Sequence, residues 1–247
     1  KNPMNAVPTI KKSNYLAKQN KEVLPVCETI TVFTDGEIEK FKAEAHKKYP
    51  SGKPKHNQAA AYMLMLNTGL RTAEALGLIN SDIDLEKKVM YIQRGVKEAQ
   101  KRDGTERKSG REIVVGKLKT ASSKRIVPLN ETAIQAIIEL RNERYFGEDA
   151  PLIPDADGNF TRPLNLRKRF YSILDAAGIK KKGLHSLRHT FATKLVTGVR
   201  AEDGTIKALT PRQVADLLGH TTSEITEMYY VKRNMDMLMG VTNGFEL

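Results

Sequence analysis

The chain of 247 residues has no tryptophan and a single cysteine, Cys27. One cysteine cannot form an internal disulfide or supply a cysteine-rich zinc site, and this scarcity fits a reducing compartment. No apolar run reaches the roughly 20 residues that cross a bilayer, and residues 1–30 lack the apolar core of a signal peptide. The sequence therefore predicts a cytoplasmic protein with no membrane anchor.

Acidic residues are also few compared with basic ones. The chain has 41 Lys and Arg against 29 Asp and Glu, which gives a formal net charge of +12. Basic side chains that meet phosphates release condensed counterions, so this excess indicates a nucleic acid partner. A solvated basic surface without a partner is the alternative that composition leaves open.

The first residues are predicted to form an arm. Residues 1–31 are polar and poorly periodic, with scattered Pro, Lys and Asn. The chain opens on Lys rather than Met, which predicts a fragment or a processed form.

Helical signals dominate the rest of the chain. Thr34 to Glu37 form a capping box, Asn130 and Thr210 are N-cap candidates, and Gly69 should end a buried apolar helix. In the helix expected near residue 190, Leu187, Phe191 and Leu195 are predicted to form the buried stripe. The predicted helices cover about residues 35–49, 57–67, 71–78, 131–144, 164–177, 184–197, 211–218 and 222–230.

Between residues 84 and 129 the pattern changes to strands. KVMYIQ, REIVVGKL and KRIVPL carry β-branched and aromatic residues in rough alternation. Asp103-Gly104 is a hairpin-turn signal, and the density of Lys and Arg from Lys97 to Arg111 predicts a projecting basic hairpin. The expected fold class is α+β: a mostly helical domain with a small antiparallel sheet.

Four short segments contain side chains that suggest chemistry. Taken singly, each has a structural explanation: an ion pair at i,i+3 spacing, a solvated basic turn, a helix cap, or a packed tyrosine. The residues are Arg71 with Glu74, Lys119, His185 with Arg188, and His220 with Tyr229.

Taken together, these residue types match what phosphoryl transfer without a metal requires. Arginine binds nonbridging phosphate oxygens in a bidentate fork. Tyrosine can act as a covalent nucleophile, lysine can protonate a leaving oxygen, and histidine can exchange protons near neutral pH.

Two other kinds of site match the sequence only in part. Gly110 to Leu118 resembles a phosphate-binding loop, but the spacing between its glycines is one residue too long and Leu118 replaces the Ser/Thr. His185, His189 and His220 could bind zinc, but Ser follows His185 where a zinc protease has Glu. We expect no metal and no other cofactor.

The four segments resemble those of the tyrosine recombinase, or phage integrase, family in their order and in their local sequence, and the resemblance runs from about Thr31 to Arg233. The resemblance implies the catalytic fold of that family, with a small antiparallel sheet and an extended basic hairpin. In the implied mechanism Tyr229 attacks the scissile phosphate and forms a 3′-phosphotyrosyl link. The implied supporting roles are phosphate binding by Arg71 and Arg188, leaving-group protonation by Lys119, assistance by His185 and His220, and orientation of Arg71 by Glu74.

The resemblance also implies a domain organisation. Residues 1–31 would be a linker from a missing N-terminal core-binding domain, and residues 32–233 the catalytic domain. Residues 94–116 form a hairpin longer than is usual in the family, which together with the ending YYVKR…TNGFEL is most similar to integrases of conjugative transposons. Residues 234–247 would be a tail that docks on a neighbouring subunit or on its own domain.

The implied function is site-specific recombination for integration or excision of a mobile element, in a prokaryotic cytoplasm at the nucleoid. The expected partners are double-stranded DNA at specific recombination sites and further copies of the chain, in a tetramer, with no membrane. The alternatives are relaxation of DNA by a type IB topoisomerase and a non-catalytic DNA-binding accessory role. The expected DNA contacts are Lys97, Lys101, Arg102, Arg107, Lys108, Arg111, Lys124 and Arg125.

Overall fold

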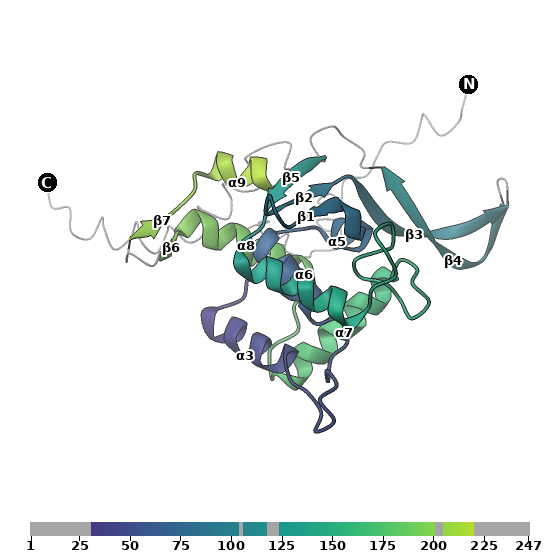
Figure 1. The fold of residues 1–247 in the computed structure, drawn as a ribbon, viewed down its shortest axis with the longest axis horizontal. Coiled ribbons are helices and arrows are strands. Elements are labelled where there is room, and N and C mark those ends of the chain that lie inside the picture. The colour runs from purple at the N-terminus through teal and green to yellow at the C-terminus, as the bar shows by residue number, and fades with distance from the viewer. Residues whose placement is uncertain (1–30, 104–105, 118–123, 201–204, 220–247) are drawn as a thin grey trace, which may run out of the picture. The chain divides into compact units, whose positions relative to one another are not determined.

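The computed structural model describes residues 31–103, 106–117, 124–200 and 205–219 (Figure 1). The arm, apart from Thr31, the helix expected over 222–230 and the tail lie outside these residues. Within the described ranges the helices are α3 (Asp35–Ala45), α4 (Ala60–Thr68), α5 (Thr72–Gly77), α6 (Glu131–Glu143), α7 (Pro163–Ala176), α8 (His185–Thr197) and α9 (Pro211–Leu218), with a 3-10 turn, η2 (Asn80–Asp82).

The starts predicted near residues 35, 131 and 211 are confirmed, and at each one the N-cap side chain accepts a hydrogen bond from a first-turn backbone N–H that has no partner inside the helix. The helix predicted from residue 57 begins later, at Ala60. Thr34 Oγ accepts from the Glu37 N–H at 3.2 Å, and the Glu37 carboxylate accepts from the Thr34 N–H at 2.8 Å. Asn130 Oδ1 accepts from the Ala133 N–H at 2.8 Å. The predicted end of α3 at residue 49 is wrong: the chain turns at residue 46, and the Tyr49 N–H donates to the Lys53 carbonyl at 2.9 Å. Pro50 disfavours the helical conformation in the residue before it.

Helix α4 occupies the centre of the core, as its uninterrupted apolar sequence predicts. Every residue from Ala60 to Met65 is buried. Tyr62 donates its hydroxyl to the Leu166 carbonyl at 2.7 Å. Gly69 ends the helix in the left-handed conformation, with φ of 64°. The aromatic rings around α4 belong to Phe33, Phe41, Tyr62 and Phe170, and their contacting centroids lie 5.3 to 6.3 Å apart.

The strands in the described residues form small antiparallel sheets. One sheet has the order β1-β2-β5, and its register pairs Met90 with Val127. The sheets are built from β1 (Ile83–Asp84), β2 (Val89–Ile92), β3 (Arg94–Asp103), β4 (Glu106–Lys117), β5 (Arg125–Pro128), β6 (Val199–Arg200) and β7 (Ile206–Lys207).

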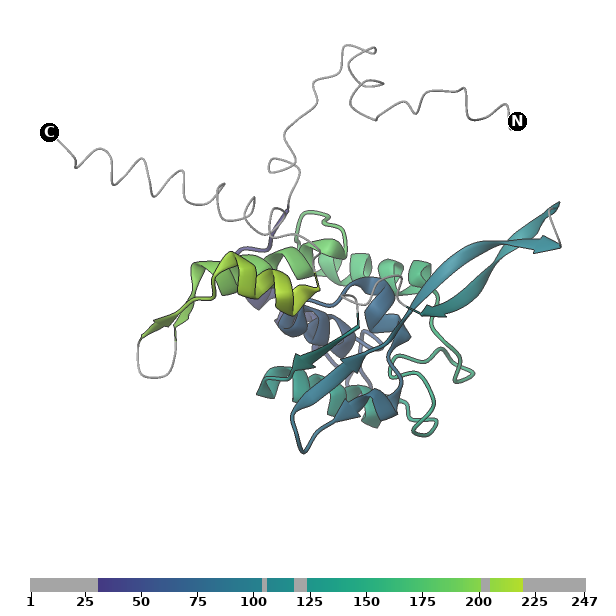
Figure 2. The ribbon, with the colours of Figure 1, turned by 90° about the horizontal axis from the view of Figure 1, so that it is seen from above.

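Strands β3 and β4 form the predicted hairpin, which extends away from the helices (Figure 2). Asp103 pairs with Glu106, so the chain reverses at the predicted position. At the other end of the hairpin, a Cβ on Gly77 would lie 2.8 Å from the carbonyl oxygen of Arg94. The backbones of α5 and β3 are therefore in direct contact, and a larger residue at position 77 would separate them.

Helices α8 and α9 form a second, smaller core from Ala192, Val196, Val214 and Leu218. The short β6–β7 hairpin joins them, and the sequence did not predict it. Strands of two residues are too short to show an alternating pattern.

Candidate active site

The predicted pair Arg71 and Glu74 stands where α5 begins. Arg71 is the residue before the first helical turn, and Glu74 accepts from its backbone N–H at 2.9 Å. The Arg71 guanidinium donates to Glu74 Oε1 at 2.7 Å. The ion pair that offered a structural explanation for Arg71 is therefore present. It also holds the guanidinium in one place, while 34% of the Arg71 side chain stays exposed.

Arg188 lies on α8 and points inward. It is 3% exposed, and its Nη1 donates to the Gly69 carbonyl at 2.6 Å. The predicted buried stripe of α8 is therefore only partly correct: Leu187 is buried, whereas Phe191 and Leu195 are half-buried. Arg188 can point inward because backbone carbonyls compensate for the loss of water around its charge.

The C-terminal end of α9 brings three arginines together. The last carbonyls of a helix lack partners inside it and carry the negative end of its dipole. Three successive carbonyls each accept from one guanidinium: Leu217 from Arg125 at 3.0 Å, Leu218 from Arg188 at 2.9 Å and Gly219 from Arg71 at 3.2 Å. His220, the next residue in the sequence, lies outside the described residues.

His185 stands beside this cluster at the start of α8. The protein around its ring displaces water and lowers the pKa of His185, and the charges of Arg188 and Arg71 lower it further while Glu74 opposes them. The rings of His185 and His189 pack edge to face with centroids 5.2 Å apart. Burial, followed by the charges of His185 and Arg188, lowers the pKa of His189 to about 4. Both rings are therefore mainly neutral at pH 7, and a neutral imidazole nitrogen can accept a proton.

The structure thus brings four of the predicted site residues to one place: Arg71, Glu74, His185 and Arg188. The other three, Lys119, His220 and Tyr229, lie outside the described residues.

Arg125 differs from its sequence prediction. The sequence groups it with the cations that contact DNA, but its side chain is 7% exposed and forms an ion pair with Glu74 at 2.9 Å. A signal for this placement was present in the strand. Successive side chains of a strand point to opposite faces, so Arg125 shares the inward face of Val127 while Ile126 faces outward with 58% exposure.

The exposed cations of the β3–β4 hairpin lie apart from this cluster. Lys97, Lys101 and Arg111 are exposed, and Lys124 is exposed just before β5. The side chains of Arg102, Arg107 and Lys108 are outside the described part of the structure. Gly110 to Lys117 lie within β4, so the segment that resembles a phosphate-binding loop is a strand, as predicted.

Among the residues that the structure describes, no three His, Cys, Asp or Glu side chains are grouped so that they could hold a metal ion. Within the same four segments, no helix combines the length and the hydropathy that crossing a membrane requires.

Comparison with known proteins places the whole described region in one family. The model of the phage integrase family matches residues 31–237. A XerC-like tyrosine recombinase from Caldanaerobacter subterraneus subsp. tengcongensis is 32% identical over 233 residues, which cover 87% of this chain and 56% of that protein. The chain thus spans about half the length of the curated relatives it matches.

Solved structures show the same fold. The Tn1549 transposon integrase, in complex with a circular intermediate DNA, has a TM-score of 0.64 at 20% identity, with 89% of this chain and 68% of that chain covered. A lambda integrase dimer bound to a core site has a TM-score of 0.54 at 16% identity, with 88% and 64% covered. The predicted fold, the catalytic fold of tyrosine recombinases, is confirmed. The chain belongs to the phage integrase family.

Proposed function

We propose that the protein is a site-specific tyrosine recombinase that cuts and rejoins DNA. The observation that carries this proposal is the convergence of Arg71 and Arg188 on neighbouring carbonyls of α9, directly before His220 in the chain. Two guanidiniums held this close together suit one phosphodiester, whose nonbridging oxygens gain charge in the transition state.

In the proposed reaction the Tyr229 oxygen forms a bond to phosphorus, and the bond from phosphorus to the 5′ oxygen breaks. Lys119 gives a proton to that 5′ oxygen, while the phenol proton of Tyr229 passes to His185 or His220, which also assist by hydrogen bonding. The neutral state of His185 suits a proton acceptor. Arg188 is buried at 3% exposure. A phosphate therefore reaches its guanidinium by replacing the Gly69 or Leu218 carbonyl as hydrogen-bond acceptor, or by displacing the side chains that bury it. Rejoining reverses these steps: the 5′ hydroxyl attacks the phosphotyrosyl link and releases Tyr229.

The first test replaces Tyr229 by Phe, with Tyr230→Phe as the matched control. On a nicked suicide substrate, which loses its 5′ hydroxyl fragment after cleavage, the wild type and Tyr230→Phe should accumulate a covalent adduct. Tyr229→Phe should bind the same DNA and form no adduct, because it lacks the nucleophilic oxygen. Denaturing gels measure the adduct, and gel shifts measure binding.

Other outcomes of this assay point elsewhere. An adduct in Tyr229→Phe rejects the assignment of the nucleophile. DNA binding without any wild-type adduct favours the non-catalytic accessory role. Efficient relaxation of a supercoiled plasmid that lacks a recombination site favours the topoisomerase.

We further propose that the β3–β4 hairpin contacts the DNA backbone. Replacing Lys97, Lys101 and Arg111 by Gln should weaken binding and reduce the slope of log K against log salt by up to about 3, since each lost phosphate contact removes about 0.9. Titrations at several salt concentrations measure this slope.

The matched control replaces Lys40, Lys48 and Lys53 by Gln, which changes the net charge equally on exposed positions of α3 and the loop after it. An equal change of slope in both triple variants would reject the hairpin as a specific contact and leave a general effect of net charge.

Integration or excision of a mobile element, of the conjugative-transposon type, is the narrower function that we propose. The extended basic hairpin and the structural likeness to the Tn1549 integrase support it. A Xer-type recombinase is the second candidate, because the XerC-like relative is 32% identical. In either case the proposed site of action is the cytoplasm of a prokaryote, at the nucleoid.

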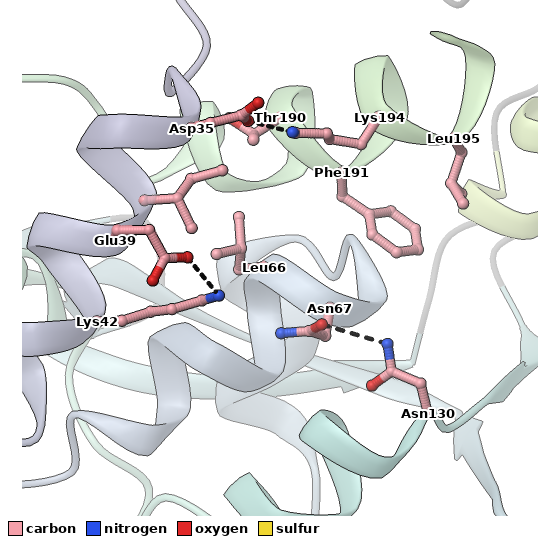
Figure 3. A pocket seen from close by; sticks show the side chains of 11 residues that line it. Asp35, Glu39, Lys42, Leu66, Asn67, Asn130, Thr190, Phe191, Lys194 and Leu195 are labelled. Atoms are coloured by element: carbon pink, nitrogen blue, oxygen red, sulfur yellow. Dashed lines mark hydrogen bonds and ion pairs between the residues drawn. The ribbon is translucent and has the colours of Figure 1, made fainter. Parts of the chain in front are cut away.

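The proposed working unit is a tetramer on DNA in which the tail from Met235 to Leu247 docks on a neighbouring subunit. A groove of about 390 Å³ between α3, α4 and α8 has the character that an apolar tail requires (Figure 3). Its rim carries the ion pairs Lys194–Asp35 and Lys42–Glu39. Its apolar lining consists of Ile38, Leu66, Phe191 and Leu195.

A further inference from the structure

Arg125 connects three elements of the candidate site. Its Nη1 and Nη2 donate to the two carboxylate oxygens of Glu74 at 3.1 and 2.9 Å. Its Nε donates to the Leu217 carbonyl at 3.0 Å. A single guanidinium on β5 thus contacts both the helix that follows Arg71 and the end of the helix that precedes His220.

The backbone of Arg125 is fixed by the sheet. Arg125 pairs with Ile92 at the end of the β2–β5 ladder, and Val127 is buried two residues further on. The planar guanidinium matches the plane of a carboxylate and presents its Nε–H in a third direction. Lysine has no such geometry, because its ammonium is a single point of charge.

Glu74 is held from two sides. Oε1 accepts from the guanidiniums of Arg71 and Arg125, and Oε2 accepts from the backbone N–H of Arg71 and from Arg125. At 2% exposure the carboxylate has little contact with water, so these bonds determine its orientation. Without Arg125, half of the bonds to Glu74 disappear, and Arg71 loses the fixed partner that orients it.

We propose that Arg125 is a positioning residue for DNA cleavage: it fixes Glu74 against Arg71 and keeps the end of α9 in place beside Arg188. This inference rests on the proposed function, because it assumes that Arg71 and Arg188 bind the scissile phosphate. In this role Arg125 does not touch the DNA, since its Nε, Nη1 and Nη2 each donate to Leu217 or Glu74 and its side chain is 7% exposed.

The positioning role of Arg125 should be visible in the pH dependence of cleavage, because Arg125 affects the ionisation of Glu74. Burial raises the pKa of Glu74, but hydrogen bonds and charge from Arg125, followed by those from Arg71, outweigh it and hold the pKa below its ordinary value. Among the described residues, the charged or titratable groups that face Glu74 are Arg71 just before α5, Arg125 from β5 and His185 from α8. Loss of Arg125 should therefore let Glu74 take up a proton at higher pH, so that the acid side of the pH–rate profile of cleavage moves to higher pH.

The test uses the full chain and the suicide substrate at saturating protein. Arg125→Gln should bind DNA within about twofold of wild type, yet form the Tyr229 adduct about 100-fold more slowly at pH 7, the cost of a misplaced catalytic group. Arg125→Lys, which keeps the charge without the fork, should recover part of the rate. In a Glu74→Gln background, Arg125→Gln should cost much less and produce no shift in the pH profile, because both changes act through one carboxylate.

Arg141→Gln is the matched control. Arg141 is half-buried on α6 and donates to the Asn80 side chain and carbonyl at 3.2 and 2.9 Å, away from the cluster. It should lower thermal stability without moving the pH profile.

Three results would overturn the proposal. The first is cleavage by Arg125→Gln at the wild-type rate. The second is a rate loss in Arg125→Gln no greater than that in Arg141→Gln, with an unchanged pH profile. The third is a smaller salt dependence of DNA binding in Arg125→Gln, which would make Arg125 a DNA contact. If Arg125→Gln does not fold, the same profile measured on Arg125→Lys decides. An absent wild-type adduct would instead reject the proposed function, whereas an adduct that depends on Tyr229 and is unaffected by changes at Arg125 rejects only this inference.

Discussion

Arg188→Ala should slow formation of the Tyr229 adduct by about 100- to 1,000-fold, or 2.7–4 kcal/mol, the typical effect of removing one preorganised donor from a developing oxyanion. In the proposed mechanism Arg188 binds a nonbridging oxygen whose charge grows as the phosphorus is attacked. Single-turnover cleavage of the suicide substrate, at protein concentrations that saturate the DNA, measures the rate of this step.

Arg188→Lys separates charge from geometry. Lysine keeps the positive charge but cannot donate to the Gly69 and Leu218 carbonyls and to a phosphate in one fixed fork. We expect a smaller loss of rate than with Ala. Because Arg188 also holds two backbone segments together, the thermal stability of each variant must be measured, and rates compared only on folded protein. Cleavage by Arg188→Ala within about threefold of wild type would contradict the assigned role.

Glu74→Ala should lower the free energy of unfolding by about 3–5 kcal/mol. Removing one partner of a buried ion pair leaves the other charge without compensation, and here Arg125 is 7% exposed and loses both of its bonds to the carboxylate. Urea unfolding followed by circular dichroism measures the difference. Glu39→Ala is the control, because Glu39 is 73% exposed in its pair with Lys42 and should contribute less than about 1 kcal/mol.

The ionisation of Glu74 should also make the stability of the fold depend on pH. The folded-state pKa of Glu74 is lower than its ordinary value of 4.5, so its ionised form stabilises the fold fully above that value. This contribution should be lost as pH falls below about 4.5 towards the folded-state pKa, and Glu74→Ala should lack it. Equal losses for Glu39→Ala and Glu74→Ala, or an identical pH dependence with and without Glu74, would contradict this account.

Most of the helices could be predicted because their signals are local. The capping box at Thr34, the caps at Asn130 and Thr210 and the glycine at 69 act within a few residues of themselves. An apolar run such as Ala60 to Met65 needs burial on every side, whichever elements provide it. The basic hairpin was equally accessible, since its turn signal and its alternation lie in one continuous segment.

The inward orientation of Arg188 could not be predicted from its own helix. Its partners, the carbonyls of Gly69 and Leu218, lie 119 and 30 residues away in the chain. A polar residue normally faces water unless distant groups satisfy it, and only the folded chain supplies those groups. Arg125 was a different case: the alternation of its strand already placed it on the inward face, but the density of basic residues around it favoured a DNA contact.

In the proposed mechanism Arg71 and Arg188 neutralise the nonbridging oxygens of the phosphate that Tyr229 attacks. The most direct measurement compares Arg188→Ala with wild type on two suicide substrates, one with the natural scissile phosphodiester and one with an uncharged methylphosphonate in its place. A methylphosphonate lacks the negative charge that the guanidinium neutralises. The loss of cleavage rate caused by Arg188→Ala should therefore be at least about tenfold smaller on this substrate than on the phosphodiester. An equal penalty on both substrates would mean that Arg188 supports the fold around Gly69 and Leu218 and not the phosphate.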